Sequence, residues 1–335
     1  CTANHPLPNF FRLPSTHQEG DIPLMGLVTG AADAIECVLR KIGIQDSEFT
    51  ASTGTGRIHI YNGNGATVPG AAPERSLYAS QASINKYDMT IFACEGQQFA
   101  KFPAQQQLLI NYTNAGGRVF ATHYNYTWLY NVPPFQNTAT WQIDQTLPPS
   151  PLTAFIDATN PRAERLADWL TSIGASTVHG QVEVTEARHD FNTVDTSKAS
   201  QWLYWNQGNQ RIPLEYSFET PVGAAAQQQC GRVMFSDFHV DATSSTNILF
   251  PRECDNLPLT PQERLLEFML FDLSSCVSEA PPATCTPETC ADQGIGCGPA
   301  GDGCGHPLDC GSCSYPETCG GGGVPGACGN PFCRE

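Results

Sequence analysis

The chain has 335 residues, of which 40% are hydrophobic and 15% charged, so it can bury a core and does not have the composition of a disordered protein. Its 33 acidic and 17 basic residues give a net charge of −16, which repels nucleic acids and anionic membranes. The longest apolar stretch, residues 22–39, contains Asp33 and Glu36 and falls short of the roughly 20 apolar residues of a membrane helix. We therefore expect no nucleic-acid partner and no transmembrane segment.

Cysteine usage indicates the compartment. Nine of the 15 cysteines lie in the last 55 residues, a density typical of cross-linked proteins outside the reducing cytosol. We therefore expect a secreted protein, extracellular or at the cell surface. No leader precedes Cys1, so an export signal has been removed or lies upstream; Cys1 either starts a fragment and forms a disulfide or is the acylated cysteine of a lipoprotein. The odd total leaves one thiol free or paired with another chain.

The first half alternates strands and helices after a proline-rich lead-in over residues 1–20. Apolar periodicity predicts strands at 22–30, 57–63, 86–96 and 118–123, and helices at 31–43 and 105–117. This alternation predicts parallel pairing through right-handed crossovers, and hence an α/β sheet. The near-continuous apolar character of 86–96 predicts helices on both faces of that sheet.

The second half has less regular patterns. It predicts an irregular insertion at 132–160, a helix at 161–174, short β segments and loops at 179–223, a central strand at 230–241 and a closing helix at 260–275. Pro161 and Gly174 bound the first of these helices, and Thr260 with Glu263 forms a capping box at the start of the second. The α/β domain is therefore predicted over residues 21–277.

A Pro-rich linker at 278–284 precedes a Cys/Gly-rich domain at 285–335. Two segments sharing the letters PETC start at Cys285 and Cys313, which predicts a tandem repeat. A segment with so few aliphatic residues depends on disulfides; the alternative, a zinc site at the CGSC pair, lacks a second close pair. The predicted disulfide-forming residues are Cys285, Cys290, Cys297, Cys304, Cys310, Cys313, Cys319, Cys328 and Cys333.

The order of the segments LVTGAADAIECVLRKIG, KYDMTIFACEG, NAGGRVFATH and PVGAAAQQQCGRVMFSDFHVD resembles the ThuA-like branch of the class I glutamine amidotransferase-like fold, over about residues 20–276. The resemblance implies a flavodoxin-like parallel sheet and, through the sugar metabolism associated with ThuA-like proteins, a carbohydrate ligand. The tail lies outside that family and is similar to Cys/Gly-rich repeats in secreted proteins of predatory, matrix-forming bacteria.

In amidotransferases the nucleophile is a cysteine on a tight strand-to-helix elbow. The resemblance aligns that elbow with Thr122, His123 and Tyr124, where no cysteine stands, so glutamine hydrolysis by the standard triad is not expected. Cys94 belongs to a different strand. It is interpreted as a buried thiol or as half of a structural disulfide, with Cys37 as one candidate partner, rather than as a nucleophile.

Polar residues follow three predicted strands where ligands bind to open α/β sheets, at the carboxyl edge. They are Glu95, His123, Asp237, His239 and Asp241. As an active site, a histidine would hold a metal or shuttle a proton and Glu95 or Asp237 would be the general base; a divalent metal would be bound by His123, His239 and Asp241. The alternative is an ordinary strand end, with the histidines bonded to carbonyl groups and Glu95 in a turn.

Aromatic residues accompany this edge. Tyr124, Trp128, Trp202 and Trp205 are candidates for stacking on sugar rings, and packing in the core is the alternative ranked first. We interpret the chain as an extracellular, non-catalytic binding or structural module whose partner is a carbohydrate or another matrix component, with no cofactor required. The alternatives are a carbohydrate-active enzyme, assisted by a divalent metal, and a self-assembling structural protein that associates through Cys1, the tail and exposed aromatics.

Overall fold

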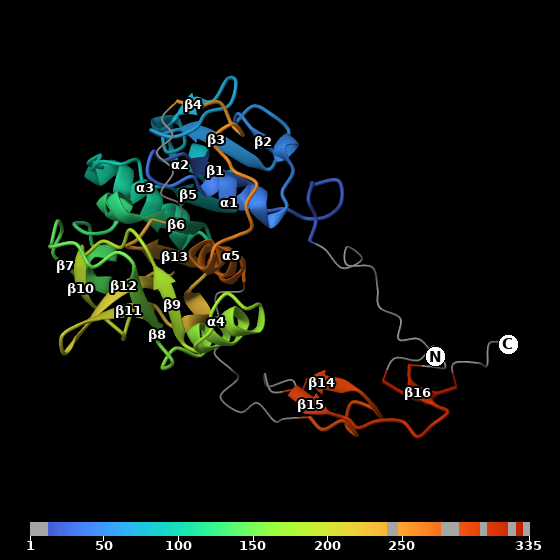
Figure 1. Cartoon of the computed structure of the whole chain (residues 1–335). Coiled ribbons are helices and arrows are strands. Elements are labelled where there is room, and N and C mark those ends of the chain that lie inside the picture. Colours follow the sequence, from blue (N-terminus) through green and yellow to red (C-terminus); the bar gives the residue numbers. More distant parts are fainter. Residues whose placement is uncertain (1–12, 240–246, 276–287, 302–306, 321–325, 331–335) are drawn as a thin grey trace. The chain divides into compact units, whose positions relative to one another are not determined.

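The computed structural model describes residues 13–239, 247–275, 288–301, 307–320 and 326–330. The chain divides into two compact units, one spanning Leu13–Ser278 and the other combining Cys1–Arg12 with Glu279–Glu335 (Figure 1). The predicted linker at 278–284 lies outside the described residues. Within the described part of the chain, no helix combines the length and the apolar character that crossing a membrane needs.

The larger unit is built on a sheet of 11 strands (Figure 1). Its parallel part contains, in spatial order, β2 (Phe49–Thr50), β3 (Ile58–Asn62), β1 (Met25–Val28), β5 (Met89–Phe92), β6 (Arg118–Thr122) and β13 (Gly231–Ser236), while β4 (Ala72–Pro73) pairs with β3. The five strands from β3 to β13 follow the order second, first, third, fourth, fifth, which is the flavodoxin-like arrangement. The predicted fold class is therefore confirmed.

Four antiparallel strands extend this sheet beyond β13. They are β12 (Gln210–Thr220), β11 (Ala199–Gln207), β8 (Leu152–Ile156) and β9 (Gln181–Val184). A separate two-stranded sheet joins β7 (Ala139–Trp141) to β10 (Phe191–Val194). The sequence prediction was wrong here in two respects: residues 132–160 contain β7 and β8, and β11 and β12 are long strands rather than short segments.

The described residues form five α-helices that flank the sheet. They are α1 (Ile35–Ile42), α2 (Gln81–Ile84), α3 (Pro103–Asn114), α4 (Pro161–Ser172) and α5 (Pro261–Ser274). The 3₁₀ segments are η1 (Asp46–Glu48), η2 (Glu74–Ser76), η3 (His123–Trp128), η4 (Phe135–Thr138) and η5 (Ala226–Gln228). Local signals explain the helix ends: Gly43 has φ 116° at the end of α1, and Thr260 with Glu263 forms the predicted capping box of α5.

Two apolar cores lie on opposite faces of the sheet. One includes Val38 of α1, Leu166 of α4 and Met269 of α5. The other includes Leu109 of α3 and Trp128 of η3. Helices therefore cover both faces, as the apolar character of the central strands predicted. A disulfide between Cys37 and Cys254 ties α1 to the segment that precedes α5.

The C-terminal unit has little apolar core. Its described strands form two small hairpins, β14 (Pro299–Gly301) with β15 (Pro307–Asp309) and β16 (Thr318–Cys319) with β17 (Cys328–Gly329). Three disulfides, Cys290–Cys310, Cys297–Cys319 and Cys313–Cys328, hold the unit together, so these six cysteines do not form a zinc site. The remaining predicted disulfide residues, Cys285, Cys304 and Cys333, lie outside the described residues, and so does Cys1.

Candidate functional site at the carboxyl edge of the sheet

The site begins at the elbow that follows β6. His123 has φ 38°, the left-handed backbone of a sharp strand-to-helix turn, and η3 starts at the same residue. The neighbouring parallel strand β13 pairs Ser236 with Thr122, so the segment after β13 emerges beside this elbow. His239 belongs to that segment, and its Nε2 lies 3.0 Å from Nδ1 of His123. The elbow therefore carries an imidazole that faces a second imidazole from the neighbouring strand.

A thiol does reach the same point, from the adjacent strand. Cys94 follows β5, is fully buried, and places its Sγ 3.3 Å from Nδ1 of His123. Its proposed pairing with Cys37 was wrong, because Cys37 is bonded to Cys254 at 2.04 Å; the alternative, a buried free thiol, is confirmed. The Cys94 amide donates to Oγ1 of Thr122 at 2.9 Å. This bond ties the backbone at Cys94 to the residue that precedes His123.

Glycine is needed where another turn approaches this thiol. A Cβ atom at Gly30 would lie 2.2 Å from the carbonyl oxygen of Cys94, and that backbone atom has little freedom to move. The same turn contains Asp33, whose Oδ2 accepts the hydroxyl of Thr122 at 2.6 Å. The loop after β1 therefore closes over the base of the site.

Acidic residues lie on the far side of His123. Oδ2 of Asp190 is 3.7 Å from Nε2 of His123, and the Asp190 amide donates to Oδ2 of Asp237 at 2.8 Å. Oδ1 of Asp237 is buried without a hydrogen-bond partner among the described residues. Burial is the main cause that raises the pKa of both carboxyls. The negative charge of Asp190 raises the pKa of Asp237 further. The sequence analysis predicted Asp237 at this edge of the sheet. It missed Asp190, which lies beside Asp237.

Arg188 closes the cluster on the His239 side. Its Nη2 lies 3.5 Å from Nδ1 of His239 and 3.1 Å from a carboxylate oxygen of Glu186. Its amide donates to the carbonyl of Asp237 at 2.7 Å, so the segment that carries Arg188 and Asp190 is tied to the end of β13. This segment connects β9 to β10, in the part of the chain for which the sequence predicted only short β segments.

Burial keeps the three central side chains neutral. It lowers the pKa of His123 to about 2, with the positive charges of His239 and Arg188 as further causes. Burial and Arg188 lower the pKa of His239 to about 4, and burial and Asp33 raise the pKa of Cys94 to about 12. The site therefore presents two neutral imidazoles and a protonated thiol, which is a weak nucleophile.

One predicted site residue, Glu95, has charged neighbours other than the histidines, and another cannot be placed. The charged neighbours of Glu95 are Glu74 and Lys101; burial and the negative charge of Glu74 raise the Glu95 pKa to about 7, and Lys101 opposes the rise. Asp241 lies outside the described residues. The residues that do meet here are Cys94, His123 and His239, whose Sγ, Nδ1 or Nε2 ligand atoms all lie within 4.8 Å of one another.

The candidate stacking rings lie mostly in the cores. Trp128 and Trp202 have no exposed surface, and the Trp202 indole donates to Oγ of Ser217 at 2.8 Å. Trp205 is also buried. A ring without an exposed face has nothing to stack on a sugar, so core packing explains these three tryptophans. Tyr124 differs, because it is partly exposed and its ring lies over His123 with the centroids 3.9 Å apart.

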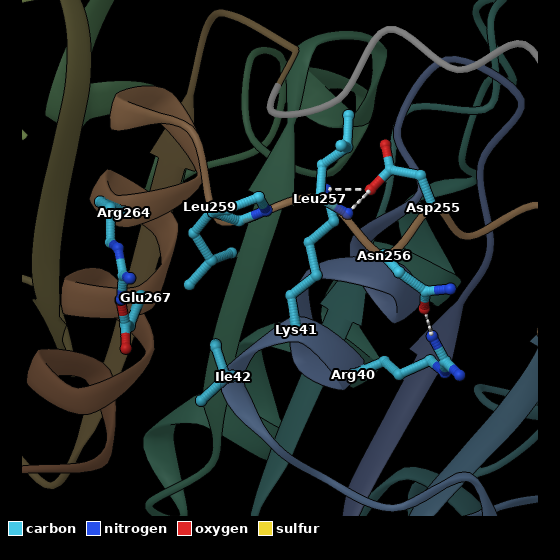
Figure 2. A pocket seen from close by; sticks show the side chains of 10 residues that line it. Arg40, Lys41, Ile42, Asp255, Asn256, Leu257, Leu259, Arg264 and Glu267 are labelled. Carbon is cyan, nitrogen blue, oxygen red and sulfur yellow. Dashed lines mark hydrogen bonds and ion pairs between the residues drawn. The ribbon is translucent and has the colours of Figure 1, made fainter. Parts of the chain in front are cut away.

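Two surface pockets lie elsewhere. One, of about 310 Å³, is lined by residues of α1, the 255–259 segment and α5 (Figure 2). Its cations are already paired: Lys41 with Asp255 and Glu263, Arg40 with Asp46, and Arg264 with Glu267. The other, of about 620 Å³, is lined by residues between 130 and 143. Neither pocket is lined by the cysteine or the histidines of the site.

Comparisons with known proteins bear on the fold only. No protein-family model matches the chain, and no curated protein matches it. A protein described as ThuA-like from Bacteroides uniformis ATCC 8492 is 9% identical with a TM-score of 0.40, covering 78% of this chain and 93% of its own. The N-terminal domain of mmIFT52 is 8% identical with a TM-score of 0.42, covering 76% of this chain and 99% of its own. A protein described as cytoplasmic from Salmonella typhimurium LT2 is 10% identical with a TM-score of 0.41, covering 75% of this chain and 99% of its own.

These scores carry no inference about the site, and the fold class follows from the strand order of the sheet itself. ThuA-like proteins are among the structural neighbours, while membership of that family stays a prediction. The disulfides of both units fit an extracellular protein, whereas the Salmonella neighbour is described as cytoplasmic.

Proposed function

We propose that the chain is an extracellular binding module that has the fold of the glutamine amidotransferases without their chemistry. The observation that carries the proposal is the elbow after β6, where His123, with φ 38°, stands at the position that the sequence resemblance aligns with the amidotransferase nucleophile. A histidine side chain there can hold a ligand or a proton. It cannot form the thioester through which glutamine hydrolysis by the standard triad proceeds.

The nearby thiol does not restore that chemistry. Cys94 is fully buried and its pKa is raised to about 12, mainly by burial. His123, its neighbour, has a pKa lowered to about 2, so the pair favours the neutral thiol and imidazole over the thiolate and imidazolium of a cysteine hydrolase. The same arrangement suits a site that offers lone pairs to a ligand.

Alkylation of the native, full chain tests this proposal. Cys230 is the matched control, because it is the other free cysteine among the described residues and it is exposed. We expect iodoacetamide to modify Cys230 in the native protein and to modify Cys94 only after denaturation, as measured by mass spectrometry of the peptides. Native labelling of Cys94 at a rate similar to Cys230, or release of ammonia from glutamine that Cys94→Ala abolishes, would contradict the proposal.

One observation favours an enzyme as the second candidate. Cys94, His123 and Asp190 follow one another in the order of a Cys-His-Asp triad, with contacts of 3.3 and 3.7 Å. The alkylation experiment separates the two candidates, because a nucleophile must be reachable in the native protein. For the enzyme reading, labelling of Cys94 would be fast and would be suppressed by substrate.

For the ligand partner, we keep the prediction of a carbohydrate or another matrix component, with Tyr124 as the partly exposed ring that supports it. We further propose that the chain is related to ThuA-like proteins, and that its C-terminal unit is a Cys/Gly-rich repeat that spaces the α/β unit within a surface or matrix protein. Binding to a glycan array that is unchanged in Tyr124→Ala would remove the ring from this proposal.

A further inference from the structure

We propose that Cys94, His123 and His239 bind a thiophilic metal ion, Zn²⁺ in the first instance, at the carboxyl edge of the sheet. This inference rests on the proposed function, because it names a ligand for the same site. One sulfur and two imidazole nitrogens form a ligand set that zinc accepts in proteins. The three side chains come from the ends of three neighbouring parallel strands, β5, β6 and β13, so a rigid sheet fixes their separation.

The spacing fits a common ion. Zinc–sulfur and zinc–nitrogen bonds of about 2.3 and 2.0–2.1 Å in a tetrahedron place sulfur and nitrogen roughly 3.6 Å apart, and two nitrogens roughly 3.3 Å apart. Here Sγ of Cys94 lies 3.3 Å and Nε2 of His239 lies 3.0 Å from Nδ1 of His123. These two separations would widen by about 0.3 Å around an ion, and all three ligand atoms lie within 4.8 Å of one another.

Hydrogen bonding alone does not satisfy this trio. Nδ1 of His123 has either one proton or one lone pair, so it can make one good hydrogen bond. It has two close neighbours, Cys94 at 3.3 Å and His239 at 3.0 Å. A cation at the centre would accept a lone pair from each of the three atoms at once. Cys94 would bind as the thiolate, and its proton would pass to the solvent.

The surroundings of His123 match the outer shell of a metal site. A ligating histidine usually donates its second ring N–H to a carboxylate, which fixes the ring and strengthens the ligand. With Nδ1 facing the ion, Nε2 of His123 faces Oδ2 of Asp190 at 3.7 Å. That oxygen is buried without a hydrogen-bond partner among the described residues, and Asp237 holds the Asp190 backbone in place through a bond of 2.8 Å.

A free thiol in the interior of the larger unit, among residues joined by disulfides elsewhere, also needs an explanation. The described residues contain four disulfides, so the chain folds under oxidising conditions. Cys94 nevertheless stays reduced and fully buried between two histidines. Coordination protects a thiol from oxidation and gives this residue a role that neither packing nor a disulfide supplies.

Co²⁺ titration of the full-length, oxidised protein tests the inference, with Zn²⁺ content measured by mass spectrometry after dialysis. We expect one ion per chain, visible d–d bands of a four-coordinate site, and a near-ultraviolet charge-transfer band from the thiolate. Cys94→Ser should abolish the charge-transfer band. Cys230→Ser, the matched control at the exposed free thiol, should leave the spectrum and the stoichiometry unchanged.

Further variants locate the ligands and the outer shell. Asp190→Asn, which changes the outer shell, should lower the affinity for Zn²⁺ by about 10–100-fold. His239→Ala, which removes a ligand, should lower that affinity further. Circular dichroism would establish that each variant is folded, and His239→Ala keeps the test open if Cys94→Ser does not fold. Failure to bind either ion, or a charge-transfer band that survives in Cys94→Ser, would overturn the inference. Neither result would affect the binding module itself, whose failure is measured by native alkylation of Cys94.

Discussion

The two units reach a stable structure by opposite means. The α/β unit buries two layers of aliphatic and aromatic side chains against an 11-stranded sheet, with the disulfide Cys37–Cys254 added to a core that exists without it. In the C-terminal unit the described strands contain two or three residues each, and Cys297 is its one buried apolar residue among those described. Disulfide bonds are therefore an addition in the larger unit and essential in the smaller one.

Reduction of the disulfides should therefore unfold the C-terminal unit and leave the α/β unit folded, and this is the largest effect that we expect. Three disulfides join residues 20, 22 and 15 positions apart, and each stabilises a small domain by roughly 2–4 kcal/mol. With dithiothreitol and no denaturant, residues 288–330 should lose all protection from hydrogen exchange. The strands β1, β5, β6 and β13 should keep theirs, as measured by mass spectrometry of peptides. Protection of 288–330 that survives complete reduction would show a core in the smaller unit that disulfides do not explain.

The same contrast explains which parts of the fold could be predicted from the sequence. Local sequence patterns predict several elements directly. Apolar runs predict the strands β1, β5, β6 and β13, and the Thr260–Glu263 capping box predicts the start of α5. β8 is not predicted in this way, because it lies in a proline-rich stretch and gains its hydrogen bonds from β11 and β9 later in the chain. Pairing between distant segments is not encoded in local periodicity.

The site divides in the same way. That His123 and His239 would meet followed from parallel strands ending at one edge, although 116 residues separate them. The closeness of Cys94 to His123 depends on which strands are neighbours, and the position of Asp190 depends on a connection between β9 and β10 that has no periodic pattern. The segment RHDF contains the polar residues, but nothing in the sequence directs them to the sheet edge.

The core-based stability of the α/β unit predicts the next largest effect. Trp128 is fully buried, with its ring 5.0 Å from Phe92 and 4.9 Å from Tyr78, measured between centroids. Trp128→Ala should lower the free energy of unfolding of this unit by about 3–5 kcal/mol, because it removes a large ring and leaves a cavity. Leu147→Ala, at an exposed position of the same unit, is the control and should have little effect.

Urea unfolding followed by circular dichroism would measure both variants. If Trp128→Ala changed the midpoint no more than Leu147→Ala, the core on that face of the sheet would not be the source of stability. The disulfides of the C-terminal unit should stay intact in both variants, because urea does not break covalent bonds.

A smaller effect distinguishes the units by pH. Glu215 is completely buried on β12, accepts a hydrogen bond from Ser236 and has a pKa raised to about 8, mainly by burial. Asp292 of the C-terminal unit is exposed, and hydrogen bonds from Thr289 lower its pKa. Between pH 4.5 and about 8 the unfolded Glu215 carboxyl is ionised while the folded one keeps its proton, so the α/β unit loses stability as the pH rises through this window. Asp292 acts in the opposite direction, since its contribution is lost as the pH falls below its ordinary range.

Glu215→Gln isolates the first of these terms, because glutamine accepts the same hydrogen bond and does not titrate. Relative to this variant, the wild-type α/β unit should become less stable by a few kcal/mol between pH 5 and pH 8, at about 1.4 kcal/mol for each unit of pKa shift. Urea unfolding of both proteins at several pH values measures the difference, in which the titrations of the other buried groups cancel. A difference that is constant over this range would mean that the Glu215 carboxyl is ionised in the folded protein. The low-dielectric core that we assign to the larger unit would then not surround β12.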